Sequence, residues 1–269
     1  MTTVTPIRES GDWDPGRYLE FAEERLRPAV DLLSRINMDA PAVIYDLGCG
    51  TGSVTALLAR RWPLAWVTGV DSSPAMLAAA RETLPQGHWQ TADIGHWSAT
   101  PRGNLVVSNA ALQWLDDHES LMPRVMAQVA PGGLLAVQMP RNYHAPSHRA
   151  MAEAIAAGPW EERLTAALRA LPASGPVATP TVYYDILAPH CAALEIWETE
   201  YLHVLDGESP VVDWTMGSAL RPVLDALEPS ERDDFVAEYT ARIAAAYPRR
   251  SDGRTLFPFR RLFILATHP

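Results

Sequence analysis

Lysine is absent from this chain of 269 residues, so all 22 of its basic residues are arginine. Because 32 acidic residues outnumber them, the formal net charge is −10 at pH 7. A protein that binds nucleic acid needs a basic face to contact the phosphates. The composition therefore argues against a nucleic-acid partner, and any anionic ligand would need a locally basic pocket.

Cysteines and long apolar runs are also scarce. Two cysteines, Cys49 and Cys191, make neither a disulfide framework nor a metal site. The sequence contains no run of about eighteen or more apolar residues, so we expect no membrane span. Residues 1–10 lack the apolar core of a signal peptide. We expect a cytosolic protein with no membrane partner.

The eight histidines show no metal-ligand spacing, so we expect no metal site. Only His144 and His148 are four residues apart, and Pro146 between them argues against a helix there. This pair is expected to lie in a solvated loop.

A glycine-rich turn is the most informative feature that is present. It comprises Asp46 to Gly52, follows the apolar run Ala42–Tyr45 and precedes a helix-like segment at Ser53–Arg61. The spacing is G-x-G-x-G, and Ser53 stands where a dinucleotide fingerprint needs its third glycine. This disfavours a NAD oxidoreductase and resembles the first motif of S-adenosylmethionine (SAM) methyltransferases. The residues expected to contact the cofactor are Asp46, Gly48, Cys49, Gly50 and Gly52.

Polar residues recur at the ends of the next strands along the chain. Asp71 follows the apolar stretch 65–70, and Ser72 and Met76 belong to the start of the next helix. Asp93 with Ile94 and then Asn109 end two further strands. Open α/β sheets bind ligands at the carboxyl ends of their strands, where an acid accepts hydrogen bonds from ribose hydroxyls. We therefore expect all six of these residues in the cofactor site, with Asp71 on the ribose and Asp93 and Ile94 beside the adenine.

The remaining pattern predicts the architecture. A fifth strand is expected at Leu134–Met139, and two late strands at Leu194–Leu205 and Arg260–Thr267. Helices are expected at Pro210–Leu227 and Pro229–Tyr247, between the late strands. The predicted fold class is α/β, a class I methyltransferase Rossmann-like sheet of seven strands with the last antiparallel, plus a helical lid. The expected parts are an N-terminal helical cover (1–40), a SAM-binding core (41–205), a helical insertion (206–255) and a final strand (256–269).

Further blocks make the resemblance more specific. The chain resembles the trans-aconitate 2-methyltransferases, small SAM-dependent enzymes that esterify a tricarboxylate. Besides the glycine-rich turn and Gly69–Met76, the blocks that carry this resemblance are Asp12–Pro15, Tyr18–Phe21, Glu24–Val30, Asn109–Leu115, Ala136–Pro140, Tyr183–Leu187, Leu220–Pro222 and Arg261–Ile264.

The resemblance implies SAM as the cofactor, a small acid as the substrate, and a monomer or homodimer. It implies substrate contacts from Trp13, Tyr18, Phe21, Gln113, Trp114, Tyr183, Tyr184, Arg221 and Arg260, with Arg261 as the alternative to Arg260. One of the two tyrosines is expected to face the core, and Trp114 has core packing as its alternative role.

No catalytic acid or base is expected, because a carboxylate with a pKa near 4 is already ionised at pH 7. Two alternatives remain open at this point. One is a SAM-dependent methyltransferase that acts on another small metabolite, and the other is a SAM-binding module without turnover.

Overall fold

The computed structural model describes residues 26–169, 177–216 and 219–269. Its centre is a seven-stranded sheet in the order β3-β2-β1-β4-β5-β7-β6. The strands are β1 (Val43–Leu47), β2 (Trp66–Asp71), β3 (His88–Thr91), β4 (Gly103–Asn109), β5 (Val129–Pro140), β6 (Ala193–Leu205) and β7 (Thr255–Thr267). β7 pairs antiparallel with both β5 and β6, whereas the other pairs are parallel. The predicted fold class is confirmed.

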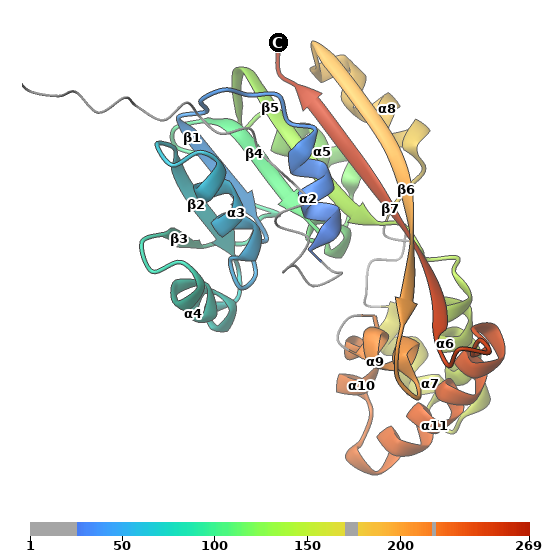
Figure 1. Cartoon of the computed structure of the whole chain (residues 1–269). Helices are drawn as coiled ribbons and strands as arrows, with labels where there is room; N and C mark the ends of the chain where they lie inside the picture. Colours follow the sequence, from blue (N-terminus) through green and yellow to red (C-terminus); the bar gives the residue numbers. More distant parts are fainter. Residues whose placement is uncertain (1–25, 170–176, 217–218) are drawn as a thin grey trace, which may run out of the picture.

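Helices cover both faces of the sheet and form a separate group beyond it (Figure 1). The helices are α2 (Arg27–Ser34), α3 (Ser53–Arg61), α4 (Pro74–Thr83), α5 (His118–Met126), α6 (Pro146–Ala157), α7 (Glu161–Arg169), α8 (Pro180–Leu187), α9 (Pro210–Met216), α10 (Arg221–Ala226) and α11 (Pro229–Ala246), with 3-10 turns η1 (Leu112–Trp114) and η2 (Ala188–His190). None of the described helices combines the length and the apolar character needed to cross a membrane.

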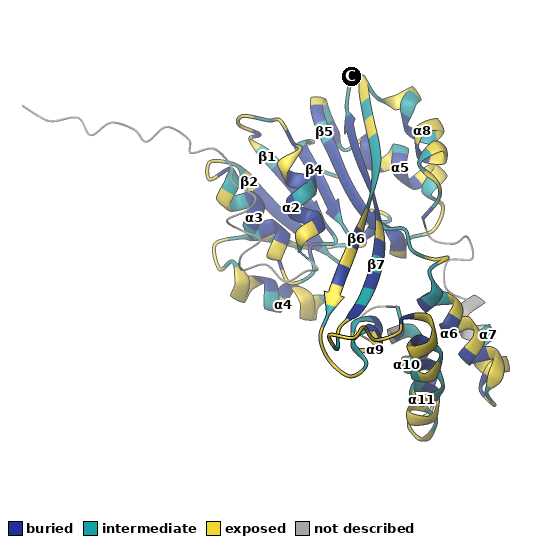
Figure 2. Cartoon of the chain, turned by 45° about the vertical axis from the view of Figure 1, so that its right-hand side comes forward, coloured by how far each residue is buried: buried dark blue, intermediate teal, exposed yellow. Residues whose placement is uncertain are grey.

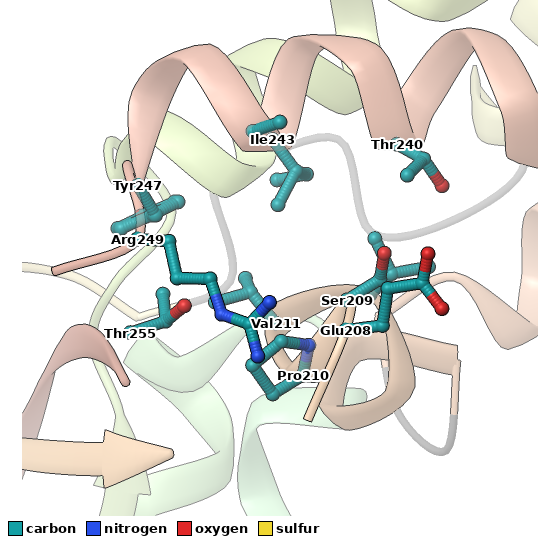
Figure 3. A pocket seen from close by; sticks show the side chains of 11 residues that line it. Glu208, Ser209, Pro210, Val211, Thr240, Ile243, Tyr247, Arg249 and Thr255 are labelled. Atoms are coloured by element: carbon teal, nitrogen blue, oxygen red, sulfur yellow. The ribbon is translucent and has the colours of Figure 1, made fainter. Parts of the chain in front are cut away.

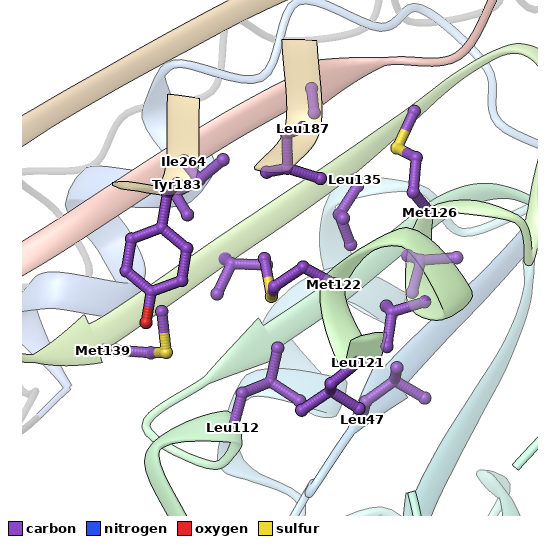
Figure 4. Close-up of a cluster of buried hydrophobic side chains, with 14 of the residues drawn as sticks. Leu47, Leu112, Leu121, Met122, Met126, Leu135, Met139, Tyr183, Leu187 and Ile264 are labelled. Atoms are coloured by element: carbon purple, nitrogen blue, oxygen red, sulfur yellow. The ribbon is translucent and has the colours of Figure 1, made fainter. Parts of the chain in front are cut away.

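Two apolar clusters hold the helices on the sheet. One joins α2 and α3 to one face through Leu32, Leu57 and Phe263. The other joins α5 and α8 to the opposite face, with Tyr183 and Met122 among its fully buried members (Figure 4). Each fully buried side chain of this size contributes about 1.5–3 kcal/mol. Figure 2 shows the resulting buried strands between helices whose outer sides are exposed.

Strands β6 and β7 extend beyond the part of the sheet in which β5 pairs with β7. β5 pairs with β7 only over residues 261–267, whereas β6 pairs with β7 along the whole of residues 255–267. The part of β7 before Arg261 and its partner residues in β6 therefore form a two-stranded ribbon that leaves the sheet. Figure 2 shows the end of this ribbon exposed on β6, where Leu202 and Val204 are 57% and 45% exposed.

The ribbon carries a helical lobe, which we define as α6, α7, α9, α10 and α11. A third apolar cluster joins these helices to Phe257 and Phe259 of the ribbon. The lobe thus includes α6 and α7, from the stretch of sequence that we assigned to the SAM-binding core, as well as the expected insertion. The expected division of the chain into four parts stays a prediction.

Some elements differ from the sequence-based expectation. The segment 210–227 holds two helices, α9 and α10, instead of one. His148 lies in helix α6 and not in a solvated loop, because Pro146 is the first helical residue, a position where the missing N–H costs nothing. The last strand begins at Thr255 instead of Arg260.

Candidate active site

The glycine-rich turn is shaped by left-handed backbone and close packing. Gly48, Gly50 and Gly52 have φ values of 70°, 53° and 80°, a region that side chains disfavour. A Cβ at Gly48 would lie 2.2 Å from the Cβ of Ala111, so this glycine lets the turn approach the segment after β4. A Cβ at Gly50 would meet no atom of the described residues within 4 Å. The backbone at Gly50 therefore borders open space that a ligand can enter.

Asp71 ties this turn to the start of helix α4. Its Oδ2 accepts a hydrogen bond of 2.9 Å from the N–H of Gly50, and its Oδ1 accepts one of 2.8 Å from the N–H of Ser73. A carboxylate has about four lone-pair sites, so both oxygens can still accept hydroxyl donors. Asp71 can thus hold the turn and bind a ribose at the same time. Ser72 and Met76 lie beside it and are exposed.

Asp46 lies beneath the turn and is 1% exposed. Its Oδ2 accepts a hydrogen bond of 2.6 Å from the hydroxyl of Thr55 in α3. Burial, and to a smaller extent the charge of Asp71, raises the pKa of Asp46 to about 6, while the bond from Thr55 lowers it. Asp46 supports the turn from below. Burial also raises the pKa of the neighbouring Cys49 thiol well above its usual range, so this cysteine stays a neutral packing residue.

Asp93 and Ile94, which follow β3, are more exposed than Asp46. Asp93 accepts hydrogen bonds from the N–H of Gly95 at 2.8 Å and pairs with His96 Nδ1 at 2.6 Å. These bonds, with that from His96 the larger, lower the pKa of Asp93. Ile94 is half-buried and lies 3.7 Å from the position of a Cβ at Gly48. Ile94 is thus next to the glycine-rich turn, and the adenine contacts of Asp93 and Ile94 stay a prediction.

The end of β4 brings two unsatisfied amide oxygens into the same region. Asn109 Oδ1 and Gln113 Oε1 are buried and have no hydrogen-bond donor among the residues that the structure describes. Between them Ala110 has a φ of 53°, unusual for a residue with a Cβ, and Gln113 Nε2 donates to its carbonyl at 2.7 Å. Strained backbone of this kind persists where surrounding contacts fix it, and it concentrates at functional sites.

The expected substrate residues differ in how deeply they are buried. Gln113 lies at the strand ends, and Trp114 beside it is 54% exposed, so it does not pack in the core. Tyr183 is fully buried, which raises its pKa to about 12, and its hydroxyl pairs with His118 Nδ1 at 2.6 Å. Tyr184 is 57% exposed, so Tyr183 is the tyrosine that faces the core.

Of the remaining expected contacts, the structure describes the side chain of Arg260 alone. The side chain of Arg260 is 47% exposed and pairs with Glu200 at 3.4 Å. Arg221 begins helix α10, but its side chain is outside the described part of the chain. Trp13, Tyr18 and Phe21 likewise lie outside the described residues.

Gln138 is a buried residue that the sequence reasoning did not select as a site residue. It pairs with Asn109 across β4 and β5, and it is 0% exposed. The signal for it was present, since Gln138 is the single polar residue in the run Leu134–Met139. A polar residue inside an apolar strand needs a partner, and the strand pattern alone does not show which one.

Two cavities lie outside this region. One, of about 80 Å³, is partly open to solvent and is lined by residues such as Val211 and Ile243 of the helical lobe and by Arg249 (Figure 3). Drug-sized ligands occupy roughly 300–1,000 Å³, so this cavity admits only a few water molecules. The other, of about 670 Å³, lies between α5 and α8 and includes His118 and Asp185. Within the described ranges, no group of three or more His, Cys, Asp or Glu residues could hold a metal ion.

Comparisons with known proteins agree with this geometry. Residues 44–133 match the family model described as a methyltransferase domain. Among solved structures, the YcgJ protein of Bacillus subtilis superposes with a TM-score of 0.55 at 10% identity, covering 89% of this chain and 97% of that one. Phosphoethanolamine N-methyltransferase 2 of Haemonchus contortus gives 0.53 at 15% identity, covering 90% of this chain and 52% of that one. At such identities the likeness shows the fold alone.

Relatives of much higher identity are found by sequence. The trans-aconitate 2-methyltransferase of Azoarcus sp. (strain BH72) is 50% identical over 94% of this chain and 98% of its own length. The enzymes of the same name from Rhodopseudomonas palustris (strain BisB18) and Yersinia pseudotuberculosis are 48% and 47% identical, each over 95% of this chain and 98% of their own. With its glycine-rich turn and strand-end residues in place, the chain belongs to the trans-aconitate 2-methyltransferase family.

Proposed function

We propose that this protein transfers a methyl group from SAM to a carboxylate of trans-aconitate, giving a monomethyl ester and S-adenosylhomocysteine. The observation that carries the proposal is identity of 50% to a relative of that name along nearly the whole of both chains. The strand-end geometry supports it, because the residues present there fit the donor.

Several strand-end residues suit particular groups of SAM. The open space at Gly50 admits a ligand against the backbone, and the spare lone pairs of Asp71 suit two ribose hydroxyls. The buried amide oxygens of Asn109 and Gln113 lack donors among the described residues, and an amino or ammonium group would supply them. When bound, SAM supplies an electrophilic methyl group on a positively charged sulfur. The carboxylates of Asp46 and Asp71 place negative charge near that region.

The chain's own contribution to the chemistry is positional. A carboxylate acceptor is already ionised at pH 7, so no side chain has to remove a proton. Holding the two reactants in line and excluding water can by itself account for a large part of the rate enhancement. The role that we propose for the strand-end residues is therefore to bind and orient the two reactants.

Methyl transfer from labelled SAM to a panel of acids, phenols and amines tests the proposal. Base-labile label on trans-aconitate is expected, and citrate, isocitrate and cis-aconitate serve as competing acids. An Asp71→Asn variant should lose SAM affinity and turnover together. Label on a phenol or amine in place of the acids, or SAM binding with no turnover at all, would contradict the proposal. We expect a monomer or a homodimer, which analytical ultracentrifugation distinguishes.

A further inference from the structure

Three neighbouring strands place polar side chains in a row on the face of the sheet that α2 covers. Asn109 of β4 pairs with Gln138 of β5, and Gln138 pairs with Phe263 of β7. Arg261 is two residues from Phe263, so its side chain leaves β7 on the same face. The row Asn109–Gln138–Arg261 thus starts at the strand ends of the donor site and leads towards the helical lobe.

The last two members of this row, Gln138 on β5 and Arg261 on β7, are in contact and deeply buried. Gln138 is 0% exposed and Arg261 is 6% exposed. Arg261 Nη1 donates to Gln138 Oε1 at 3.4 Å, and the guanidinium lies 4.5 Å above the ring of Phe259. A charged group with this little solvent around it needs hydrogen-bonding partners in the protein or in a ligand.

The side-chain amide of Gln138 has an unsatisfied hydrogen-bond donor among the described residues. Its oxygen is used by Arg261, but its Nε2 has no acceptor among the residues that the structure describes. Buried amide groups rarely stay unsatisfied, so this N–H group calls for an acceptor that the described residues do not supply. The acceptor has to lie beside a guanidinium, and a carboxylate meets that requirement best.

The charges around the row favour an anion. Arg27 of α2 and Arg261 both lower the pKa of His203, after the larger effect of burial, so their positive potential reaches across the ribbon. The carboxylate of Asp31 on α2 is engaged by the hydroxyl of Tyr201 at 2.6 Å. The region is thus locally basic in a chain of net charge −10.

We propose that Gln138 and Arg261 form the subsite that holds a carboxylate of the acid substrate other than the one being methylated. This inference rests on the proposed function, because it places that acid at the end of the row whose other end, Asn109, faces the donor. It replaces Arg260 as the anion ligand on β7. Successive side chains of a strand point to opposite faces, so Arg260 leaves β7 on the face away from Gln138, where it contacts Glu200.

The test compares Arg261→Gln and Gln138→Met with Arg260→Gln. In the first two variants we expect the KM for trans-aconitate to rise at least about 10-fold, since a hydrogen bond to a charged group is lost. The Kd for SAM should stay within about 2-fold, because the turn that binds it is untouched. Arg254→Gln, which removes an exposed arginine paired with Asp206, is the control for loss of one positive charge.

A substrate with a single carboxylate makes the result specific. The KM for crotonate, a monocarboxylate analogue with no second carboxylate for the subsite, should change much less in both variants, so their preference for the tricarboxylate should fall. Equal losses on both acids, or a loss in Arg260→Gln alone, would overturn the subsite. Gln138→Met keeps the size of the side chain, so it remains informative if Arg261→Gln does not fold.

Failure of the proposed function can be told apart from failure of the subsite. If the wild-type protein does not methylate trans-aconitate, the proposed function fails, and calorimetric binding of trans-aconitate in the presence of S-adenosylhomocysteine still tests the subsite. Binding that is lost in Gln138→Met and retained in Arg254→Gln would support it. Binding that all the variants retain would overturn it.

Discussion

Gly50 combines two properties that seldom coincide in one residue, a left-handed backbone and open space around its missing side chain. Substitution by alanine should therefore cost only about 1–2 kcal/mol of stability, from the unfavourable φ. The methyl group would occupy space that the donor needs, so we expect SAM affinity to fall by more than 10-fold. Thermal unfolding and calorimetric titration with SAM measure the two effects separately.

Gly48→Ala is the matched comparison, because its Cβ would lie 2.2 Å from Ala111. There we expect a larger loss of stability than at Gly50, since the turn itself has to move. Equal effects of both substitutions on stability would contradict the distinction between a ligand-facing and a packing glycine.

Asp46 shows how burial and charge compete at this site. Its pKa is raised to about 6, against roughly 3.9 for an unfolded aspartate, so between these values the folded protein holds a proton that the unfolded chain has released. Its contribution to stability is therefore present below about pH 4 and is lost as the pH rises through 6. Asp46→Asn should raise the free energy of unfolding by roughly 1–3 kcal/mol at pH 7.5 relative to wild type, and by less at pH 4.5.

The same substitution should weaken SAM binding, because it removes negative charge beneath the turn. Chemical denaturation at the two pH values, with SAM titrations at pH 7.5, tests both halves. If Asp46→Asn is no more stable than wild type at pH 7.5, the prediction is wrong, and the hydrogen bond from Thr55 offsets the cost of burying the Asp46 charge.

At the scale of single elements, the β6–β7 ribbon contains a buried histidine. Burial, and then the charges of Arg261 and Arg27, lowers the pKa of His203 to about 4. An unfolded histidine takes up its proton near pH 6.5, so stability is present above that value and is lost as the pH falls towards 4. We expect wild type to lose about 1–2 kcal/mol of stability between pH 7 and pH 5, a loss that His203→Phe should not show.

Denaturation curves of the two proteins at pH 7 and pH 5 provide the comparison. His203 lies among Trp214, Phe257 and Phe259, so a phenylalanine can keep the aromatic contacts. Parallel pH dependence in both proteins would rule out His203 as the group responsible.

Elements with local signals could be predicted from the sequence, and those defined by distant partners could not. Turn residues at fixed spacing predicted the loop after β1, and a helix start was expected at Ser72 to Met76, where Ser73 accepts from the N–H of Met76. Pro146 was misread because a proline starts a helix as readily as it breaks one. Thr255 to Phe259 were missed because their strand pairs only with β6, which is distant in sequence.

The candidate site divides in the same way. The residues of the donor site follow strands whose order in the sheet matches a known pattern, so their meeting point could be predicted. The contact between Gln138 and Arg261 could not be predicted from the sequence, because it depends on the register of β5 against β7. Arg260 and Arg261 are adjacent in sequence, and only the structure shows that Arg261 is buried against Gln138 whereas Arg260 is exposed beside Glu200.

At the scale of the whole molecule, the sheet and the helical lobe have separate apolar clusters. Phe235 of α11 is fully buried in the lobe, with its ring 5.5 Å from Trp160 and 6.4 Å from Tyr239. Phe235→Ala should cost about 3–5 kcal/mol. We expect faster hydrogen exchange in α6, α7 and α11 and weaker turnover of the acid, with the Kd for SAM unchanged.

Leu58→Ala, a truncation in the cluster between α3 and the sheet, should give the opposite pattern. It loosens the helix that follows the glycine-rich turn, so SAM binding should weaken while exchange in the lobe stays as in wild type. Identical exchange profiles for the two variants would mean that the two clusters unfold as one unit.

The lobe is assembled from two stretches of chain that are separated by α8 and β6. Removing residues 206–255 alone would leave Trp160 and Leu164 without the α10 and α11 residues that cover them, and that newly bare surface would promote aggregation. Anyone who wishes to graft the acceptor specificity of a relative onto this protein therefore has to exchange both stretches at once. A homologous recombination with a single crossover cannot do so without also replacing the strand between them.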